Sequence, residues 1–373
     1  MRSTLISMVF IVVGCSTISR AGEPDVLSEH LKGNYARSIE LYEKMPSAER
    51  TPVVIRAALE SAIHLARFPE AIAIAEENDY RTDWYVPTLE ARAARPLVIE
   101  IAEAETLPFT GGSSLDPYMP GVQGRILAAE GRAYAGPIRL DTGGEFLHLS
   151  ARRAKELGIE PVACQEGRQA ETKTNVCWAQ VDLELGRIRM KKVPVAIIHS
   201  LPAAFEPILG TNVLEQFKTE MDYPAGRLVL RPRSASFPAI SDRACVEAPF
   251  LMWADHFMFA KGRFGNQKSL NFFVDTGLVA VNTDGRQAAI KVATEDLKEW
   301  DVAFDESQKI FDPKMELGLE ALPQEGHLVI HSKLENLGFD FGGVRIHGLL
   351  GHAYFKSYLW RLDFDRRVYT LCR

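Results

Sequence analysis

The tripeptide Asp-Thr-Gly occurs twice in this sequence, at residues 141–143 and again at 275–277, each time directly after an apolar run. Two copies would arise by chance with a probability of about 0.003 at average composition. A strand that delivers a carboxylate into a tight turn permitted by glycine, formed twice, brings Asp141 and Asp275 to one centre. Paired carboxylates suit general acid–base hydrolysis. A single copy would be better explained as an ordinary β-turn in which Asp caps the backbone.

A second pair of matched segments follows the two tripeptides. Pro-Ile-Leu-Gly ends at Gly210, and Gly-Leu-Leu-Gly ends at Gly351. The two motif aspartates are 134 residues apart and these two glycines are 141 apart, so the halves have similar lengths. Asp222 and Asp363 then lie at the same distance after their respective glycines. The sequence therefore predicts an internal duplication.

These motifs resemble those of the aspartic peptidases, specifically the bacterial retropepsin-like branch, in which an apolar strand, Asp-Thr-Gly and a later apolar-apolar-Gly form each lobe. The resemblance covers roughly residues 120–373. It implies a mainly β fold with two duplicated acid-protease-type lobes, at 120–235 and 245–373. Each Asp would lie at the base of a cleft beneath a hairpin flap, and one chain would supply both.

The resemblance also implies how the site residues act on a polypeptide substrate. Asp141 and Asp275 would share one proton, because like charges a few ångströms apart do not both ionise cheaply. The ionised carboxylate would take a proton from water, while the protonated one hydrogen-bonds the scissile carbonyl. The threonines that follow would hydrogen-bond across the centre, and the glycines would permit the turns. These supporting residues are Thr142, Gly143, Thr276 and Gly277.

The positions after each motif depart from the family, which often has Ala, Ser or Thr there. Gly144 and Leu278 occupy them, and Leu278 is bulky and has no hydroxyl to offer the carboxylate. Glu145 lies where retroviral relatives often carry an acid that touches the substrate backbone; the alternative is a solvated charge at a turn. We expect these three residues to contact substrate. Leu278 also motivates the alternative function, a non-catalytic peptide- or protein-binding module on a degenerate peptidase fold.

The polar stretch from Gln165 to Asn175 is the candidate flap of the first lobe, and Trp178 just beyond it either lines the cleft or packs in a strand. If Cys15 is lipidated, four cysteines remain, for which sequence allows three pairings. We favour Cys164–Cys177, which closes a short loop around the flap, and Cys245–Cys372, which ties the start of the last region to its end. Four buried free thiols are the alternative.

The N-terminus has the layout of an export signal, with Arg2, an apolar stretch from residue 5 to 13 and then small residues. Residues 12–15 resemble a bacterial lipobox ending at Cys15, whereas residues 19–21 would suit an ordinary signal peptidase. An uncleaved buried helix is the third alternative. We therefore expect a signal peptide at 1–22 and an exported protein, periplasmic or anchored to the outer membrane as a lipoprotein, with membrane contact only through that lipid.

The elements that precede the duplicated part are expected to be helical, over residues 25–110, because Ala, Glu, Leu and Ile dominate there. Tyr35 and Phe68 open similar stretches 33 residues apart, a spacing similar to that of tetratricopeptide helix pairs that bind protein partners. The formal net charge of −6, without a dense Lys/Arg stripe, argues against nucleic-acid binding. The histidines lack metal-ligand spacing and no phosphate loop is present, so no metal or cofactor is expected.

Overall fold

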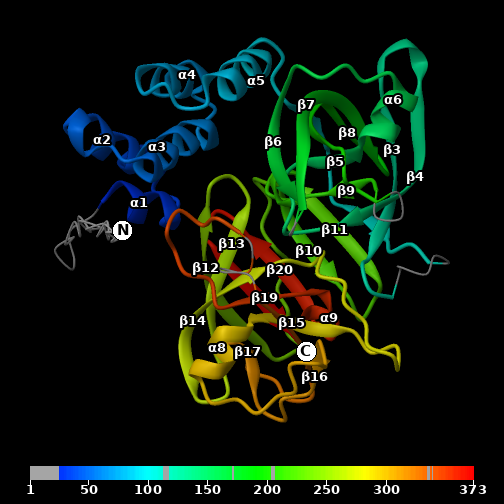
Figure 1. Ribbon diagram of the computed structural model, residues 1–373. Coiled ribbons are helices and arrows are strands. Elements are labelled where there is room, and N and C mark those ends of the chain that lie inside the picture. Colours follow the sequence, from blue (N-terminus) through cyan, green and yellow to red (C-terminus); the bar gives the residue numbers. More distant parts are fainter. Residues whose placement is uncertain (1–24, 112–116, 170–171, 203–205, 334–336, 338) are drawn as a thin grey trace, which may run out of the picture.

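The computed structural model describes residues 25–373 except 112–116, 170–171, 203–205, 334–336 and 338 (Figure 1). The predicted export signal and Cys15 therefore lie outside the described residues. Within the described part of the chain, no helix is both long enough and apolar enough to cross a membrane.

A layer of short helices forms the N-terminal region. Its members are α1 (Val26–Lys32), α2 (Tyr35–Glu43), α3 (Pro52–His64), α4 (Phe68–Glu77) and α5 (Thr82–Ala94), with a 3₁₀ turn at Ser47–Glu49. The Thr51 hydroxyl caps α3 by accepting the Val54 N–H, and Pro52 fits its first turn. The helices end earlier than the predicted boundary at residue 110, because the chain after Ala94 forms two strands that pair with the β lobes.

The first lobe is a sheet that closes on itself. Its order is β1-β8-β5-β9-β4-β3-β7-β6, with a further β7–β8 pairing. The strands are β1 (Val98–Glu100), β3 (Gly121–Leu127), β4 (Ala133–Leu140), β5 (Leu147–Ser150), β6 (Ala163–Gln169), β7 (Thr172–Leu185), β8 (Ile188–Ile198) and β9 (Ile208–Leu209); helices α6 (Ala151–Leu157) and α7 (Thr211–Leu214) and a 3₁₀ turn at Ala129–Gly131 complete the lobe. Along β7 the buried Val181 and Leu183 flank a more exposed Asp182, as the sequence alternation predicts.

The second lobe belongs to a thirteen-stranded sheet with the main order β16-β18-β15-β19-β14-β13-β12-β21-β20-β10-β11-β2, beside which β17 pairs with β13. Its own elements are β12 (Cys245–Trp253), β13 (Phe257–Phe264), β14 (Gln267–Val274), β15 (Ala288–Ala293), α8 (Thr294–Glu299), β16 (Ile310–Phe311), β17 (Leu317–Leu319), β18 (Leu328–Ser332), β19 (Gly348–Leu350), α9 (His352–Phe355), β20 (Leu359–Asp363) and β21 (Val368–Cys372). The mainly β character predicted for residues 120–373 is confirmed.

One difference from the expected lobe boundaries lies in this sheet. β10 (Phe217–Asp222) and β11 (Arg227–Pro232) were expected inside the first lobe, but β10 pairs antiparallel with β20 of the second. β2 (Glu105–Pro108), from the expected helical region, extends the sheet beside β11. The two lobes therefore share one continuous sheet.

The duplication is visible in the strand pairing. In the first lobe β4 runs parallel to β9, with Leu140 opposite Leu209. In the second lobe β14 runs parallel to β19, with Val274 opposite Leu350. In both lobes the strand that delivers Asp-Thr-Gly is thus held by the strand of the later Leu-Gly segment, which explains why the sequence repeats both.

Two disulfides join Cys164 to Cys177 and Cys245 to Cys372, the pairing favoured from the sequence. The first links the hairpin strands β6 and β7, and the second links β12 to β21. Structural disulfides persist in oxidising compartments, so both are compatible with export.

The helical region is fixed to the second lobe by its own hydrophobic cluster. This cluster joins buried residues of α3, such as Leu59, to Trp253, Phe273 and Phe341. The His64 imidazole Nε2 also lies 3.0 Å from the Ala254 carbonyl oxygen. The helices are therefore packed onto the β fold and form a wall beside the lobes (Figure 1).

Candidate active site

The two motif aspartates begin their loops in the same way. The Asp141 N–H donates to the Leu209 carbonyl at 3.0 Å, and the Asp275 N–H donates to the Leu350 carbonyl at 2.9 Å. Each carboxylate then accepts the N–H of its own loop glycine, from Gly143 at 2.8 Å and from Gly277 at 3.0 Å. Two parallel strand pairs thus place two equivalent carboxyls at one centre.

The threonines cross-link the two loops. The Thr142 N–H donates to the Thr276 hydroxyl at 2.9 Å, and the Thr276 N–H donates to the Thr142 hydroxyl at 3.1 Å. Each hydroxyl donates in turn to a carbonyl of the opposite strand, Val274 or Leu140. Both threonines are fully buried. This is the arrangement that the resemblance implies, and it fixes the loops against each other.

The carboxyls of Asp141 and Asp275 are linked through the Gly277 N–H, which lies 3.0 Å from Asp275 Oδ1. The Gly277 N–H also donates across the centre to Asp141 Oδ1 at 3.1 Å. A Cβ at Gly143 would lie 2.5 Å from Asp275 Oδ1, and a Cβ at Gly277 would overlap the Asp141 carboxyl. Glycine is therefore required at both positions so that the loops can approach.

The two carboxyls differ in proton affinity. Burial raises the pKa of both, and the charge of Asp141 and its hydrogen bond raise the pKa of Asp275 further, well above its usual value. Backbone N–H donors from Gly143 and Gly277 oppose the rise in the pKa of Asp141. Asp141 accepts two backbone N–H groups and Asp275 accepts one, so a single proton shared by the pair favours Asp275.

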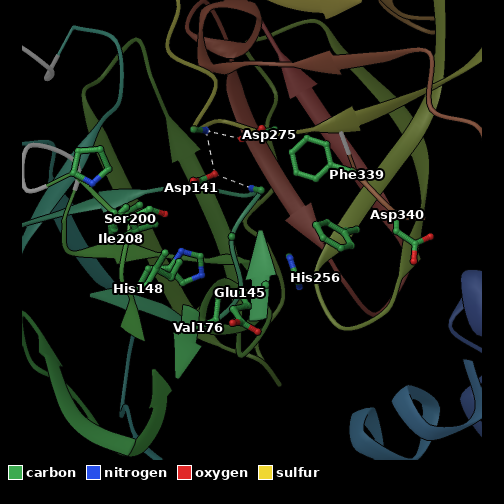
Figure 2. Close-up of a pocket in the computed structure, with 18 of the residues that line it drawn as sticks. Asp141, Glu145, His148, Val176, Ser200, Ile208, His256, Asp275, Phe339 and Asp340 are labelled. Carbon is green, nitrogen blue, oxygen red and sulfur yellow. Dashed lines mark hydrogen bonds between the residues drawn. The ribbon is translucent and has the colours of Figure 1, made fainter. Parts of the chain in front are cut away.

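A cavity of about 650 Å³ opens above the pair (Figure 2). The first lobe contributes Gly144, Glu145 and His148, and the β6–β7 hairpin contributes Gln165, Gly167 and Val176. The second lobe contributes His256, Phe257, Phe339 and Asp340, and helix α3 contributes Arg56. The predicted contact positions Gly144 and Glu145 therefore lie in the cleft, beside a hairpin where the flap was expected.

Leu278 does not line this cavity, contrary to the expected substrate contact. Its side chain packs beside the Gly351 backbone, where a Cβ on the glycine would lie 3.0 Å from Leu278 Cβ. The absence of a side chain at Gly351 gives the leucine room to turn toward the hydrophobic clusters behind the loop. The bulk of Leu278 thus does not obstruct the cleft floor. Trp178 is buried and lines a neighbouring cavity instead of this one.

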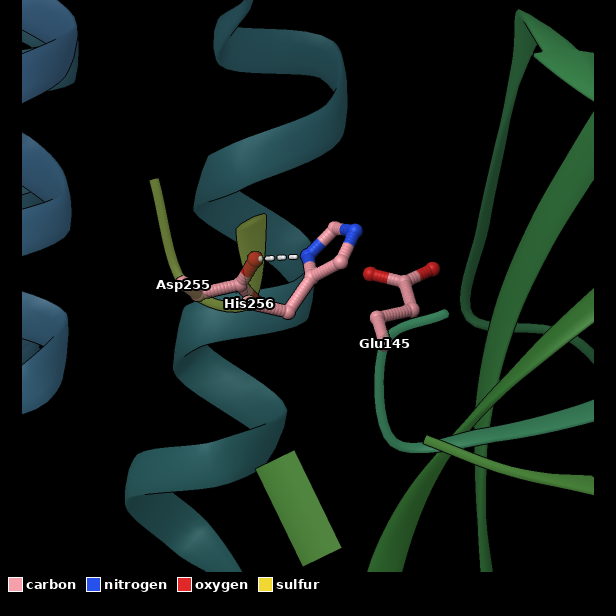
Figure 3. A group of neighbouring side chains, drawn as sticks. All are labelled: Glu145, Asp255 and His256. Carbon is pink, nitrogen blue, oxygen red and sulfur yellow. Dashed lines mark hydrogen bonds and ion pairs between the residues drawn. The ribbon is translucent and has the colours of Figure 1, made fainter. Parts of the chain in front are cut away.

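The structure adds a group that sequence reasoning missed. Asp255 and His256, in the turn between β12 and β13, face Glu145 across the cleft (Figure 3). The imidazole Nδ1 of His256 lies 2.6 Å from Asp255 Oδ1. Nothing in the sequence connects His256 with Glu145, because the two are brought together only by lobe packing.

These three residues could supply ligands to a cation, since their ligand atoms all lie within 4.8 Å of one another. Two ligands of a tetrahedral zinc ion would be about 3.4 Å apart at bond lengths of about 2.1 Å. The Glu145 carboxyl, however, forms no ion pair with the His256 ring within 4.0 Å. The positive charge of Arg92 also acts on both Glu145 and Asp255. The Glu145 and His256 ligand atoms are therefore further apart than two ligands of a tetrahedral zinc ion.

No protein-family model and no curated protein matches this sequence. Among solved structures, the chain is similar to an aspartic proteinase from Irpex lacteus, with a TM-score of 0.44 and 10% sequence identity. The match covers 72% of this chain and 97% of that one.

Proposed function

We propose that this protein is an aspartic-type endopeptidase in which Asp141 and Asp275 activate water to hydrolyse peptide bonds. One observation carries the proposal: two carboxyls on equivalent, cross-linked loops accept the same Gly277 N–H at the floor of an open cleft. Burying two acids side by side is unfavourable unless they share a proton, and such a pair can exchange protons with a reacting group.

In the proposed mechanism a water molecule is held between the two carboxyls. Ionised Asp141 removes a proton from the water as it attacks the scissile carbonyl carbon, and protonated Asp275 donates a hydrogen bond to the carbonyl oxygen. The proton gained by Asp141 then passes to the leaving amide nitrogen as the C–N bond breaks. The pair is restored with one proton, and no cofactor takes part in these steps.

The alternative of a non-catalytic binding module is less well supported. It was motivated by Leu278, whose side chain packs away from the cleft. Three further predictions accompany the proposal. They are export through the signal at 1–22, a lipid on Cys15 and a protein partner bound to the helices. A tetratricopeptide-like role for α1 to α5 belongs with them.

The test compares cleavage of a peptide library by the wild type and by Asp141→Asn and Asp275→Asn. We expect both variants to lose activity by at least about 100-fold, because each carboxyl has a separate proton-transfer role. Asp242→Asn is the matched control, since Asp242 is exposed and does not line the cleft. Equal cleavage by all four proteins would refute the shared-proton site.

A further inference from the structure

The cleft continues into a second, smaller cavity of about 130 Å³ beneath the helical region. Both cavities are lined by Arg56, Glu145, Gln165, Val176 and His256, so they adjoin along these residues. We call the smaller one the arginine chamber. At about 30 Å³ per water molecule, it has room for a few small groups of a bound peptide.

The wall of the chamber belongs to the folded core. Helix α3 is packed onto the second lobe, and the Arg56 guanidinium lies over the Trp253 ring at 5.2 Å. Helix α5 reaches the hairpin, where the Arg81 guanidinium donates to Gln165 Oε1. The helices therefore close this end of the cleft and bound the space that substrate can enter.

Arg92, on α5, is the exceptional group in the chamber lining. Its guanidinium lies over the rings of Phe68 at 4.9 Å and Phe146 at 5.4 Å. Among the described residues it has no hydrogen-bond or ion-pair partner. A guanidinium presents five N–H donors in a planar fork that matches a carboxylate. The Nε–H of Arg56, on the same wall, is also buried without a hydrogen-bond acceptor.

The other charged groups of the chamber already have partners, with one exception. Asp255 is paired with His256, and Glu60 accepts the Tyr85 hydroxyl at 2.8 Å. The exception is Glu145, whose carboxyl forms no hydrogen bond or ion pair with the described residues. The mouth of the chamber thus holds one unpaired acceptor, Glu145, and its wall holds one unpaired cation, Arg92, whereas Arg56 lies within ion-pair distance of Glu60 and Asp340.

We propose that the arginine chamber binds a carboxylate of the peptide, held by the fork of Arg92, while Glu145 accepts a backbone N–H of the same peptide. The proposal rests on the cleft binding polypeptide, as in the proposed function, and it defines a substrate class: peptides that place a carboxylate at this end of the cleft. The carboxylate can come from the C-terminus of the chain or from an Asp or Glu side chain.

The remaining charges are compatible with an anion. Burial raises the pKa of Glu145 and of Glu60 to about 7, so both are largely neutral in mildly acidic solution. The Asp255 carboxylate and a protonated His256 balance each other. Arg56 and Arg92 then leave the chamber net positive. A cationic ligand would instead meet two guanidinium groups.

The test measures binding with the Asp141→Asn protein, which keeps the peptide in the cleft uncleaved. Two matched pools of random peptides, one with free C-terminal carboxylates and one amidated, are incubated at about pH 5, and bound peptides are identified by mass spectrometry. Enrichment of the free-carboxylate pool identifies the chain end as the ligand. Enrichment of Asp or Glu in the amidated pool identifies a side chain.

Either preference should be at least about tenfold and should disappear when Arg92→Gln is added, because the paired charge is lost. Arg92→Lys, which keeps the charge but not the fork, should retain part of the preference. Arg67→Gln is the control, since Arg67 is half exposed and pairs with Glu70 outside the chamber. Binding without a carboxylate preference, a preference that survives Arg92→Gln, or no binding of either pool would overturn the proposal.

Cleavage assays separate this inference from the proposed function. If the wild type cleaves peptides without regard to their carboxylates, the chamber proposal fails and the peptidase stands. If binding depends on Arg92 and a carboxylate but no peptide is cleaved, the chamber proposal stands and the peptidase fails.

Discussion

Asp141 and Asp275 have nearly the same surroundings and yet different proton affinities. The difference arises because Gly277 donates an N–H to both carboxyls, whereas Gly143 donates only to Asp141. An extra hydrogen-bond donor favours the ionised form of a carboxyl, so Asp141 carries the negative charge when the pair holds one proton. A small inequality between two duplicated loops thus assigns the roles of base and acid.

The raised pKa of Asp275 has a consequence for stability. A carboxyl whose pKa is higher in the folded protein stabilises the fold below its unfolded pKa near 3.9, and this contribution is lost as pH rises through the folded value. The wild type therefore carries an increasing penalty for its two adjacent carboxyls as pH rises. We expect Asp275→Asn to raise Tm by a few degrees at pH 8 and to change it little at pH 4, as measured by calorimetry.

Asp242→Asn serves as the control for this experiment, because Asp242 is exposed. The same Tm difference for Asp275→Asn at both pH values would contradict the assignment of a raised pKa to this carboxyl.

At the scale of single residues, the site residues that belong to short sequence motifs could be predicted. Asp141, Thr142 and their repeats could be found because each motif carries its own turn. The direction of Leu278 could not, since it depends on the missing side chain at Gly351, which is 73 residues away. The proximity of His256 to Glu145 could not be predicted from the sequence either, because the packing of the two lobes brings these residues together.

The β6–β7 hairpin borders the cleft, and its disulfide spans 13 residues, compared with 127 for the bond between β12 and β21. Loop-closure entropy predicts a stability loss of about 3 kcal/mol on removing the short bridge and about 5 kcal/mol on removing the long one. We expect Cys245→Ser/Cys372→Ser to lower the free energy of unfolding more, as measured by urea denaturation.

Activity should follow the opposite order. Cys164→Ser/Cys177→Ser loosens the hairpin that supplies Gln165, Gly167 and Val176 to the cleft, so KM should rise several-fold. The other double variant should keep a near-normal KM while it remains folded. A larger KM change in the second variant would show that the hairpin bridge does not position substrate.

The strands next to the Asp-Thr-Gly motifs could be predicted from the sequence, whereas the strands that pair between the two lobes could not. The alternation in β7 and the hairpin ending at Val274 have local signatures. The pairing of β10 with β20 of the second lobe could not be predicted, because strand pairing between distant segments leaves no local pattern. The predicted end of the helical region at residue 110 was wrong for the same reason. The strands that pair with β1 and β2 lie about 90 and 120 residues further along the chain.

At the scale of the whole molecule, the cluster that joins α3 to the second lobe predicts a single cooperative unfolding transition. Leu59 is fully buried in this cluster. We expect Leu59→Ala to cost about 2–5 kcal/mol and to shift the unfolding of helices and strands together. Far-ultraviolet circular dichroism and tryptophan fluorescence should report the same urea midpoint.

Leu65→Ala is the matched control, because Leu65, one residue beyond α3, is 37% exposed and its truncation should cost much less. Separate midpoints for the two probes in the Leu59→Ala variant would show that the helices unfold independently of the lobes.

The shared sheet also sets an order of events during biosynthesis. β20 and β21 connect β10 of the first lobe to β12 of the second, and β21 is made from residues 368–372. A growing chain emerges N-terminus first, so both Asp-Thr-Gly tripeptides are made before β19, which holds the Asp275 loop, and before the strands that join the lobes. The protein consequently acquires its fixed pair of carboxyls only when these last strands are in place, which delays the proposed activity until synthesis of this region is finished.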